Sequence, residues 1–283
     1  MKKFTKEALN IAKKEIKIGK TLGEISNLID FHPDIISKHL RKEGVIINSS
    51  NKDLSLNVNY FNNIDTENKA YFLGFITADG CIAKDGNRVH ITINSKDDYI
   101  LDILKKELSS SNIVRKYKVL DKRKNIYHDS SVFQFSNKKI KEDLEKHGVD
   151  CNKSFSFIFP LGLPLNLLNH FLRGLLDGDG SISSSRNELF LLSTKEFLEI
   201  INNYLFNNLA KISVIQKKKN VYKLNISNKN TCIEFLKYIY TDALIFLERK
   251  YKLYNKMKIK NIKTKKESFF SIPSFQDLKN RFL

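Results

Sequence analysis

Two stretches far apart in the chain carry nearly the same phrase, FLGFITADGCI at residues 72–82 and FLRGLLDGDGSI at residues 171–182. Each is an apolar run of helical length that ends in an aspartate followed by glycine, and glycine is common where helices end. One such run alone is typical of an ordinary core helix. A second copy with the same acidic end, Asp79 in the first and Asp179 in the second, favours a functional pair.

Each run also carries two small residues spaced four apart, so that they share one face of a helix. Small residues let two helix backbones approach closely. We therefore predict that the two helices pack on each other about an internal pseudo-two-fold axis, which brings Asp79 and Asp179 together at their C-terminal ends. The predicted interface residues are Gly74, Ala78, Gly174 and Gly178.

The same order of elements follows both runs, which indicates an internal duplication. A hairpin around residues 85–87 or 185–187 is followed by an alternating strand, a polar cap and a helix. A second strand pair and a closing helix complete each copy. The sequence predicts an α+β fold of two tandem αββαββα repeats, 64–160 and 161–257, with second strand pairs at 113–119 with 126–136 and 212–217 with 221–227.

The segment 1–47 has a different, all-helical pattern. Thr21 and Glu24 have the spacing of a capping box, residues 31–33 break the chain, and a cationic third helix is expected over 34–43. This layout is typical of a helix-turn-helix that contacts DNA through Ser37, Lys38 and Arg41. The alternative is a helical bundle that serves packing alone.

Two further segments lack a clear structural pattern. Residues 48–63 are rich in Asn and Ser and are expected to form a linker, and residues 258–283 form a basic tail.

Charge indicates the class of partner. The chain has 49 Lys and Arg against 31 Asp and Glu, a net charge of +18, which favours nucleic acid or an anionic membrane surface. A membrane partner is not expected, because the longest apolar stretch, at residues 167–176, is interrupted and too short to span a bilayer.

Cysteine usage and the N-terminus bear on the compartment. Cys81, Cys151 and Cys232 lie far apart with no C-x-x-C, which fits a reducing compartment and excludes the common zinc patterns. The basic N-terminus has no uninterrupted apolar core of a secretory signal. An intracellular protein, in the cytoplasm or an organellar matrix and not secreted, is expected.

Two converging carboxylates repel each other unless a cation lies between them. Mg²⁺ is commonly bound by one or two carboxylates together with water and phosphate oxygens. Asp79 and Asp179 within a basic protein therefore indicate metal-assisted phosphodiester hydrolysis.

The two phrases resemble the paired motifs of the LAGLIDADG homing endonucleases in their monomeric, two-motif form, over residues 65–257. The resemblance implies motif helices at the repeat interface and strands that form a β-saddle in the major groove of double-stranded DNA. It implies that Asp79 and Asp179 bind Mg²⁺, for which Mn²⁺ substitutes, and that Gly80 and Gly180 lend backbone carbonyls. The chain departs from the family phrase at Thr77, where the second copy has Asp177, and at Arg173.

The family also uses one basic residue per repeat near the scissile phosphates. The resemblance implies Lys153 in the first repeat and Lys250 in the second, with Arg249 or Lys252 as alternatives for the latter. Ordinary surface lysines are the competing interpretation. The strands are expected to contact phosphates and bases through Lys84, Arg88, Arg115, Lys116, Lys118, Lys217, Lys218 and Lys223.

The sequence thus predicts a site-specific, Mg²⁺-dependent endonuclease that makes double-strand breaks in DNA, of the kind encoded in mobile introns. The alternatives are an RNA maturase that assists intron splicing and a transcription regulator that uses the fold as a DNA clamp. The paired aspartates argue against a mere clamp, and the helix-turn-helix pattern favours duplex DNA over RNA.

Overall fold

The computed structural model describes residues 4–17, 20–45, 53–84, 86–121, 125–151, 157, 159–160, 162–207, 210–216 and 221–259. The chain divides into two compact units, Met1–Lys52 and Asp53–Leu283. Each unit has its own hydrophobic core.

The smaller unit contains three helices, α1 (Lys6–Lys17), α2 (Leu22–Ile29) and α3 (Pro33–Lys42). A capping box starts α2, because the Thr21 hydroxyl accepts from the Glu24 amide and the Glu24 carboxylate accepts from the Thr21 amide. Lys38 and Arg41 on α3 are exposed, whereas Ser37 is half-buried. The core of this unit is made of Ala8, Ala12, Ile25, Phe31, Ile36 and Leu40.

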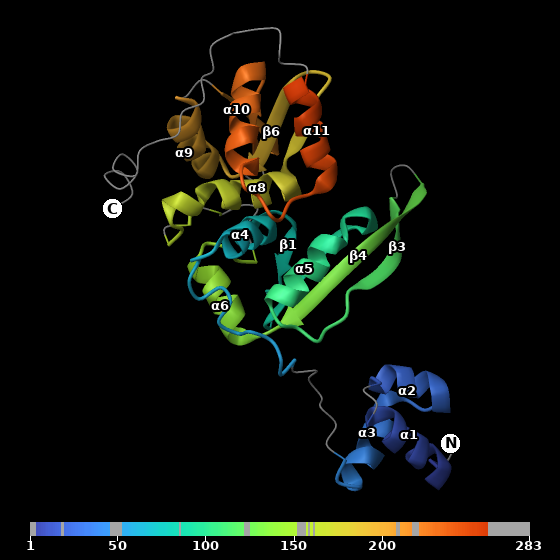
Figure 1. The fold of residues 1–283 in the computed structure, drawn as a ribbon. Helices are drawn as coiled ribbons and strands as arrows, with labels where there is room; N and C mark the ends of the chain where they lie inside the picture. The colour runs from blue at the N-terminus through green and yellow to red at the C-terminus, as the bar shows by residue number, and fades with distance from the viewer. Residues whose placement is uncertain are drawn as a thin grey trace. The chain divides into compact units, whose positions relative to one another are not determined.

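The larger unit contains two four-stranded antiparallel sheets with the same strand order, β1-β2-β4-β3 and β5-β6-β8-β7. This repetition confirms the predicted tandem fold (Figure 1). The strands of the first sheet are β1 (Gly80–Ile82), β2 (Arg88–Asn94), β3 (Arg115–Asp121) and β4 (Ile126–Ser136). Those of the second are β5 (Ser181–Ser183), β6 (Glu188–Ser193), β7 (Lys211–Gln216) and β8 (Val221–Ile226).

The motif helices α4 (Glu67–Asp79) and α8 (Leu168–Asp179) lie side by side between the two sheets (Figure 1). The other helical elements are η1 (Ser95–Asp97), α5 (Tyr99–Glu107), α6 (Lys138–Lys146), η2 (Leu165–Leu167), α9 (Lys195–Phe206), α10 (Lys229–Tyr240) and α11 (Glu248–Ile259). Of these, α11 is a helix that the sequence patterns did not single out.

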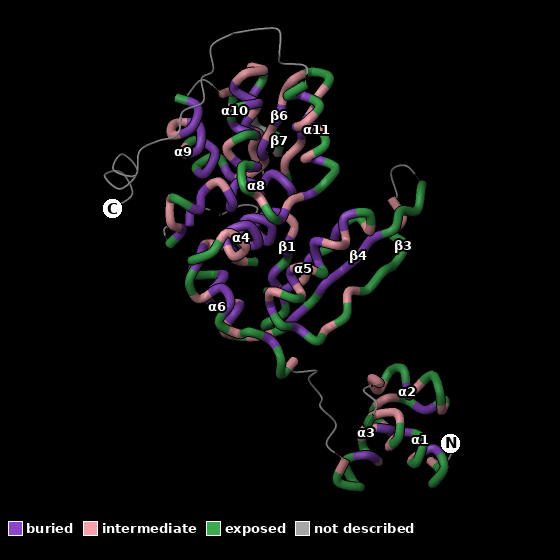
Figure 2. Tube along the Cα trace, viewed as in Figure 1, coloured by how far each residue is buried: buried purple, intermediate pink, exposed green. Residues whose placement is uncertain are grey.

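Strand alternation places the core on one side of each sheet. In β2, Val89, Ile91 and Ile93 are buried, and their partners in β4 include Phe135 and Phe133. Directly paired residues point to the same side of a sheet, so the residues between them point to the opposite side, which we call the open face. Figure 2 shows the buried residues gathered along α4 and α8, and β3 largely exposed.

The expected linker over 48–63 does not extend past residue 52. Leu56, Tyr60 and Phe61 are buried in the core of the larger unit. The Asn57 amide donates to the Leu108 carbonyl, 2.7 Å away, and the Tyr60 hydroxyl donates to Glu107. These apolar side chains stabilise residues 53–63 against the first repeat despite the polar residues around them.

No helix in the described part of the chain has the length and apolar character needed to cross a bilayer.

Candidate functional site

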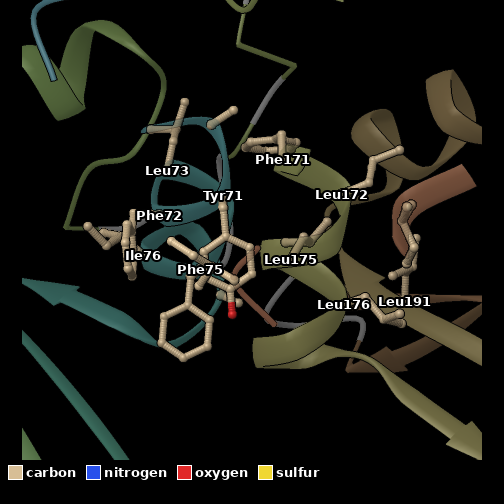
Figure 3. Close-up of a cluster of buried hydrophobic side chains, with 14 of the residues drawn as sticks. Tyr71, Phe72, Leu73, Phe75, Ile76, Phe171, Leu172, Leu175, Leu176 and Leu191 are labelled. Atoms are coloured by element: carbon tan, nitrogen blue, oxygen red, sulfur yellow. The ribbon is translucent and has the colours of Figure 1, made fainter. Parts of the chain in front are cut away.

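The contact between α4 and α8 is so close that only small residues fit. A β-carbon on Gly74 would overlap the carbonyl oxygen of Phe171, and one on Gly174 would overlap that of Tyr71 and lie 2.7 Å from the Phe75 amide. One turn further on, a β-carbon on Gly178 would overlap the side chain of Ala78. Figure 3 shows the large side chains of both helices packed around this contact.

The two motif aspartates lie at the adjoining ends of the two helices. Asp79 is the last residue of α4 and is half-buried, and Asp179 is the last residue of α8 and is exposed. A β-carbon on Gly178 would lie 3.4 Å from the carboxyl carbon of Asp79. Since Gly178 immediately precedes Asp179, the ends of the two motif helices adjoin, and the charges of both aspartates act on the same Lys250 ammonium.

Asp179 also lines a cavity of about 180 Å³ at this site, together with Thr77, Phe157, Leu175, Leu192, Ser193 and Val221. The wall therefore combines residues of both repeats.

Lys250, on α11, is buried behind this site with 3% of its surface exposed. Its ammonium donates to three carbonyl oxygens, those of Leu176 at 2.5 Å, Asp177 at 2.7 Å and Gly180 at 2.7 Å. Burial lowers the pKa of Lys250 to about 8, and the negative charges of Asp177, Asp79 and Asp179 oppose that shift.

This placement argues against the expectation that Lys250 faces a scissile phosphate. An ammonium has three N–H donors, and all three are used by backbone carbonyls. The physical reason is that the last carbonyls of a helix have no partner within the helix, and a cation there is favourable. Lys250 thus caps the C-terminal end of α8.

The alternatives to Lys250 are also paired. The Nε of Arg249 donates to Asp97 at 2.7 Å, and Lys252 forms an exposed ion pair with Glu248 at 3.1 Å. The first-repeat candidate, Lys153, lies outside the described residues.

Asp177, the earlier motif acid that the second copy keeps and the first replaces with Thr77, is fully buried and is fixed by groups from several elements. Its carboxylate accepts from the Tyr71 hydroxyl at 3.0 Å, the Leu247 amide at 2.8 Å and the Tyr240 hydroxyl at 3.3 Å. Burial raises the pKa of the Asp177 carboxyl, and the Lys250 ammonium opposes the shift. In the first repeat, the Thr77 hydroxyl donates instead to the Leu73 carbonyl, within its own helix.

Arg173, where the chain departs from the family phrase in the second copy, is also buried, and it donates to the carbonyls of Ile245 and Ile239. Arg173 and Asp177 therefore belong to one group of buried polar residues beneath the second motif. The sequence pattern alone assigns no role to Asp177 or Tyr71. The feature that distinguishes Asp177 in the sequence is that the first copy has threonine, Thr77, at the equivalent position.

The donor set at the site suits Mg²⁺. Asp79 and Asp179 offer carboxylate oxygens, and the carbonyl of Gly180 keeps a second lone pair beside the bond from Lys250. Within the described residues, no cluster of three or more His, Cys, Asp or Glu side chains could hold a metal. An Mg²⁺ ion held here would therefore take its remaining ligands from backbone, water and phosphate.

The predicted DNA contacts of the first sheet divide between its two faces. Arg115 pairs with Val132 and Arg88 with Ser136, which places both arginines on the open face. Lys116 pairs with Ser131, on the helix-covered side, and forms an ion pair with Asp98 at 2.6 Å.

The structure therefore argues against DNA contacts by Lys116 and Lys118 on the open face. Lys118 pairs with Asp129 and points to the same side as Lys116, since it lies two residues further along the strand. Both point away from the open face.

On the second sheet, Lys223 lies on the open face with its ammonium 4.4 Å from the centre of the Phe190 ring. Lys211 is exposed and pairs with Asn225, which places it on the same face. The sequence did not predict Lys211 as a DNA contact, because the face to which it points is fixed only by the pairing of β7 with β8. Lys84 is exposed just before β2, while Lys217 and Lys218 lie outside the described residues.

Among solved structures, the chain is similar to the homing endonuclease I-WcaI bound to its DNA recognition sequence. The identity is 17%, the TM-score 0.48, and the match covers 69% of this chain and 90% of that one. It is similar to the LAGLIDADG meganuclease I-AabMI bound to uncleaved DNA, with 14% identity, a TM-score of 0.44 and coverage of 68% and 90%. It is also similar to full-length DUF199/WhiA from Thermatoga maritima, with 19% identity, a TM-score of 0.45 and coverage of 79% and 68%.

No curated protein sequence matches the chain significantly. The family model described as the LAGLIDADG-like domain matches residues 66–148 and 166–240, one segment in each repeat. These segments make up more than half of the chain and contain both motif helices with their terminal aspartates. The chain therefore belongs to the LAGLIDADG-like domain family.

Proposed function

We propose that the protein is a site-specific endonuclease that makes a double-strand break in DNA by metal-dependent phosphodiester hydrolysis. The observation that carries the proposal is that Asp79 and Asp179 are the last residues of α4 and α8, whose ends adjoin. One chain supplies both repeats and both carboxylates, so the proposed enzyme acts as a monomer.

In this proposal the chain's own residues bind and orient the DNA. Arg88 and Arg115 on the first open face, and Lys211 and Lys223 on the second, hold phosphates or base edges. Asp79 and Asp179 hold Mg²⁺, with the carbonyls of Gly80 and Gly180 beside them. When bound, the ion supplies a Lewis acid that lowers the pKa of water and stabilises the leaving oxygen.

The direct test is a cleavage assay on the DNA sequences that flank the gene. The two flanks are joined directly to each other, as in a copy of the genome that lacks the gene. With Mg²⁺ or Mn²⁺ the full chain should cut this DNA at one position on both strands, and EDTA should stop the reaction. Tight binding of this DNA without any cut, in either metal, would favour the DNA-clamp alternative. Cleavage-free binding of the intron RNA in preference to DNA would favour the maturase.

Neighbouring residues of β3 provide a matched test of the open face. Arg115→Ala should weaken DNA binding and lower the salt dependence by about one unit of the log–log slope, because one phosphate contact is lost. Lys116→Ala removes the same charge from the opposite side of the strand and should leave both quantities unchanged. Fluorescence anisotropy at several salt concentrations measures both, and equal effects of the two substitutions would argue against a DNA-binding open face.

We further propose that the smaller unit binds DNA as a helix-turn-helix through the exposed Lys38 and Arg41 of α3. Deleting residues 1–52 should then shorten the footprint, weaken binding and flatten its salt dependence, since fewer counterions are released. Cleavage should persist at higher protein concentration, because Asp79 and Asp179 are retained. Footprinting and salt titration of both forms measure this, and an unchanged footprint and slope would leave the unit a packing role alone.

A further inference from the structure

The start of α11 contacts both repeats of the larger unit. On the side of the first repeat, Tyr99 of α5 donates through its hydroxyl to the Phe246 carbonyl at 2.9 Å and accepts from the Glu248 amide at 2.7 Å. Arg249 donates to Asp97 at 2.7 Å, and the Asp97 side chain is only 8% exposed. These three bonds attach residues 246–249 to the first sheet's helical layer.

The next residues attach the same turn to the end of α8. The Leu247 amide donates to the Asp177 carboxylate at 2.8 Å, and Lys250 donates to the carbonyls of Leu176, Asp177 and Gly180. Two of these carbonyls precede Asp179 and the third follows it. A single buried ammonium therefore holds the backbone on both sides of the exposed carboxylate.

Helix ends fray, and a metal ligand has to be held within a fraction of an ångström to be effective. We propose that Lys250 is a positioning residue, which fixes the backbone that carries Asp179 and links it, through the start of α11, to the repeat that carries Asp79. The inference rests on the proposed function for the identity of the ion that the two carboxylates bind. It assigns Lys250 no contact with DNA or with the ion.

The competing interpretation is that Lys250 only neutralises the buried Asp177. A double variant, Lys250→Met with Asp177→Asn, separates the two interpretations because it removes both charges. The asparagine side chain at position 177 keeps an oxygen that accepts from the Leu247 amide. If neutralisation is the whole role, this double variant should behave as wild type. If Lys250 positions the helix end, the three carbonyls lose their donor and the end of α8 should loosen.

The experiment compares wild type, Lys250→Met, the double variant and Lys252→Met as a matched control, since Lys252 is exposed on the same helix. Hydrogen–deuterium exchange of peptides that cover residues 176–182 reports the helix end directly in the free protein. Mn²⁺ titration of the DNA complex, followed by electron paramagnetic resonance, measures the affinity for the ion. Melting temperature reports the fold.

In the double variant we expect faster exchange at 176–182, Mn²⁺ affinity reduced roughly tenfold or more, and a melting temperature above that of Lys250→Met. Lys252→Met should match wild type in all three. If the double variant exchanges at residues 176–182 as slowly as wild type, the proposal is overturned, whatever its measured Mn²⁺ affinity.

Arg249→Gln keeps the test decisive if the Lys250 variants do not fold, because Arg249 is half-exposed and the glutamine amide is still able to donate to Asp97. It should also speed exchange at 176–182, and unchanged exchange there would refute the link to the first repeat. Asp179→Asn serves as the reference for the ion. Mn²⁺ binding that survives Asp179→Asn would contradict the proposed metal site itself, independently of the outcome for Lys250.

Discussion

Asp179→Asn should reduce double-strand cleavage by at least roughly a hundredfold while DNA affinity stays within a few-fold of wild type. The amide keeps the shape of the side chain but not the negative charge that balances a divalent cation. Binding is expected to persist because the carboxylate repels DNA phosphates, so its loss removes no favourable contact. Asp79→Asn should have the same effect, since the two residues occupy equivalent helix ends.

Cleavage of supercoiled plasmid and gel-shift titration measure the two quantities on the same preparation. Asp242→Asn is a suitable control, because Asp242 lies after α10 in a left-handed conformation (φ 55°) that asparagine also adopts. Near wild-type cleavage by both motif variants would exclude the carboxylates from the chemistry.

Gly174→Ala should lower the free energy of unfolding by at least roughly 3 kcal/mol. In an ordinary helix this change stabilises by about 1 kcal/mol, so the expected loss has the opposite sign to the helix propensity. The reason is that the new β-carbon would meet the backbone of α4 at Tyr71 and Phe75, which cannot rotate aside as a side chain can. Gly174→Leu and Gly74→Leu should be more damaging still.

Urea denaturation measures the effect, and Gly162→Ala is its control. A β-carbon there would lie 3.5 Å from the His147 ring, an ordinary contact, and the change should stay within about 0.5 kcal/mol. A Gly174→Ala variant as stable as wild type would show that the two motif helices do not touch through these glycines.

The repeated phrase, together with the elements that follow each copy, predicted most of the fold. The four-residue spacing of Gly74 with Ala78 and of Gly174 with Gly178, the helix-ending glycines and the period-two strands are local signals, which depend on residues close together in the sequence. They predicted the tandem sheets and the pairing of α4 with α8, which places Asp79 and Asp179 at adjoining helix ends. The apolar residues Leu56, Tyr60 and Phe61 were equally visible, but the polar residues around them favoured a linker.

The sequence of β3 did not predict which of its residues point to the open face. Its sequence, RKYKVLD, is polar on both sides, and most of the strand is exposed, so alternation alone does not say which residues share the open face. Pairing with β4 decided it, since Arg115 lies beside Val132 and Lys116 beside Ser131. Register between strands is a tertiary property wherever neither side of the strand carries an apolar pattern.

The sequence by itself determined two helices that end in aspartate, with small residues where they touch, because helix ends and helix faces depend on neighbouring residues. Only the tertiary structure decided what Lys250 does. Its three partners are backbone carbonyls at the end of α8, and every residue has a carbonyl, so no side-chain pattern marks them in advance. The path of the chain through α10 and into α11 brings the ammonium to those carbonyls, and its burial there shields it from water.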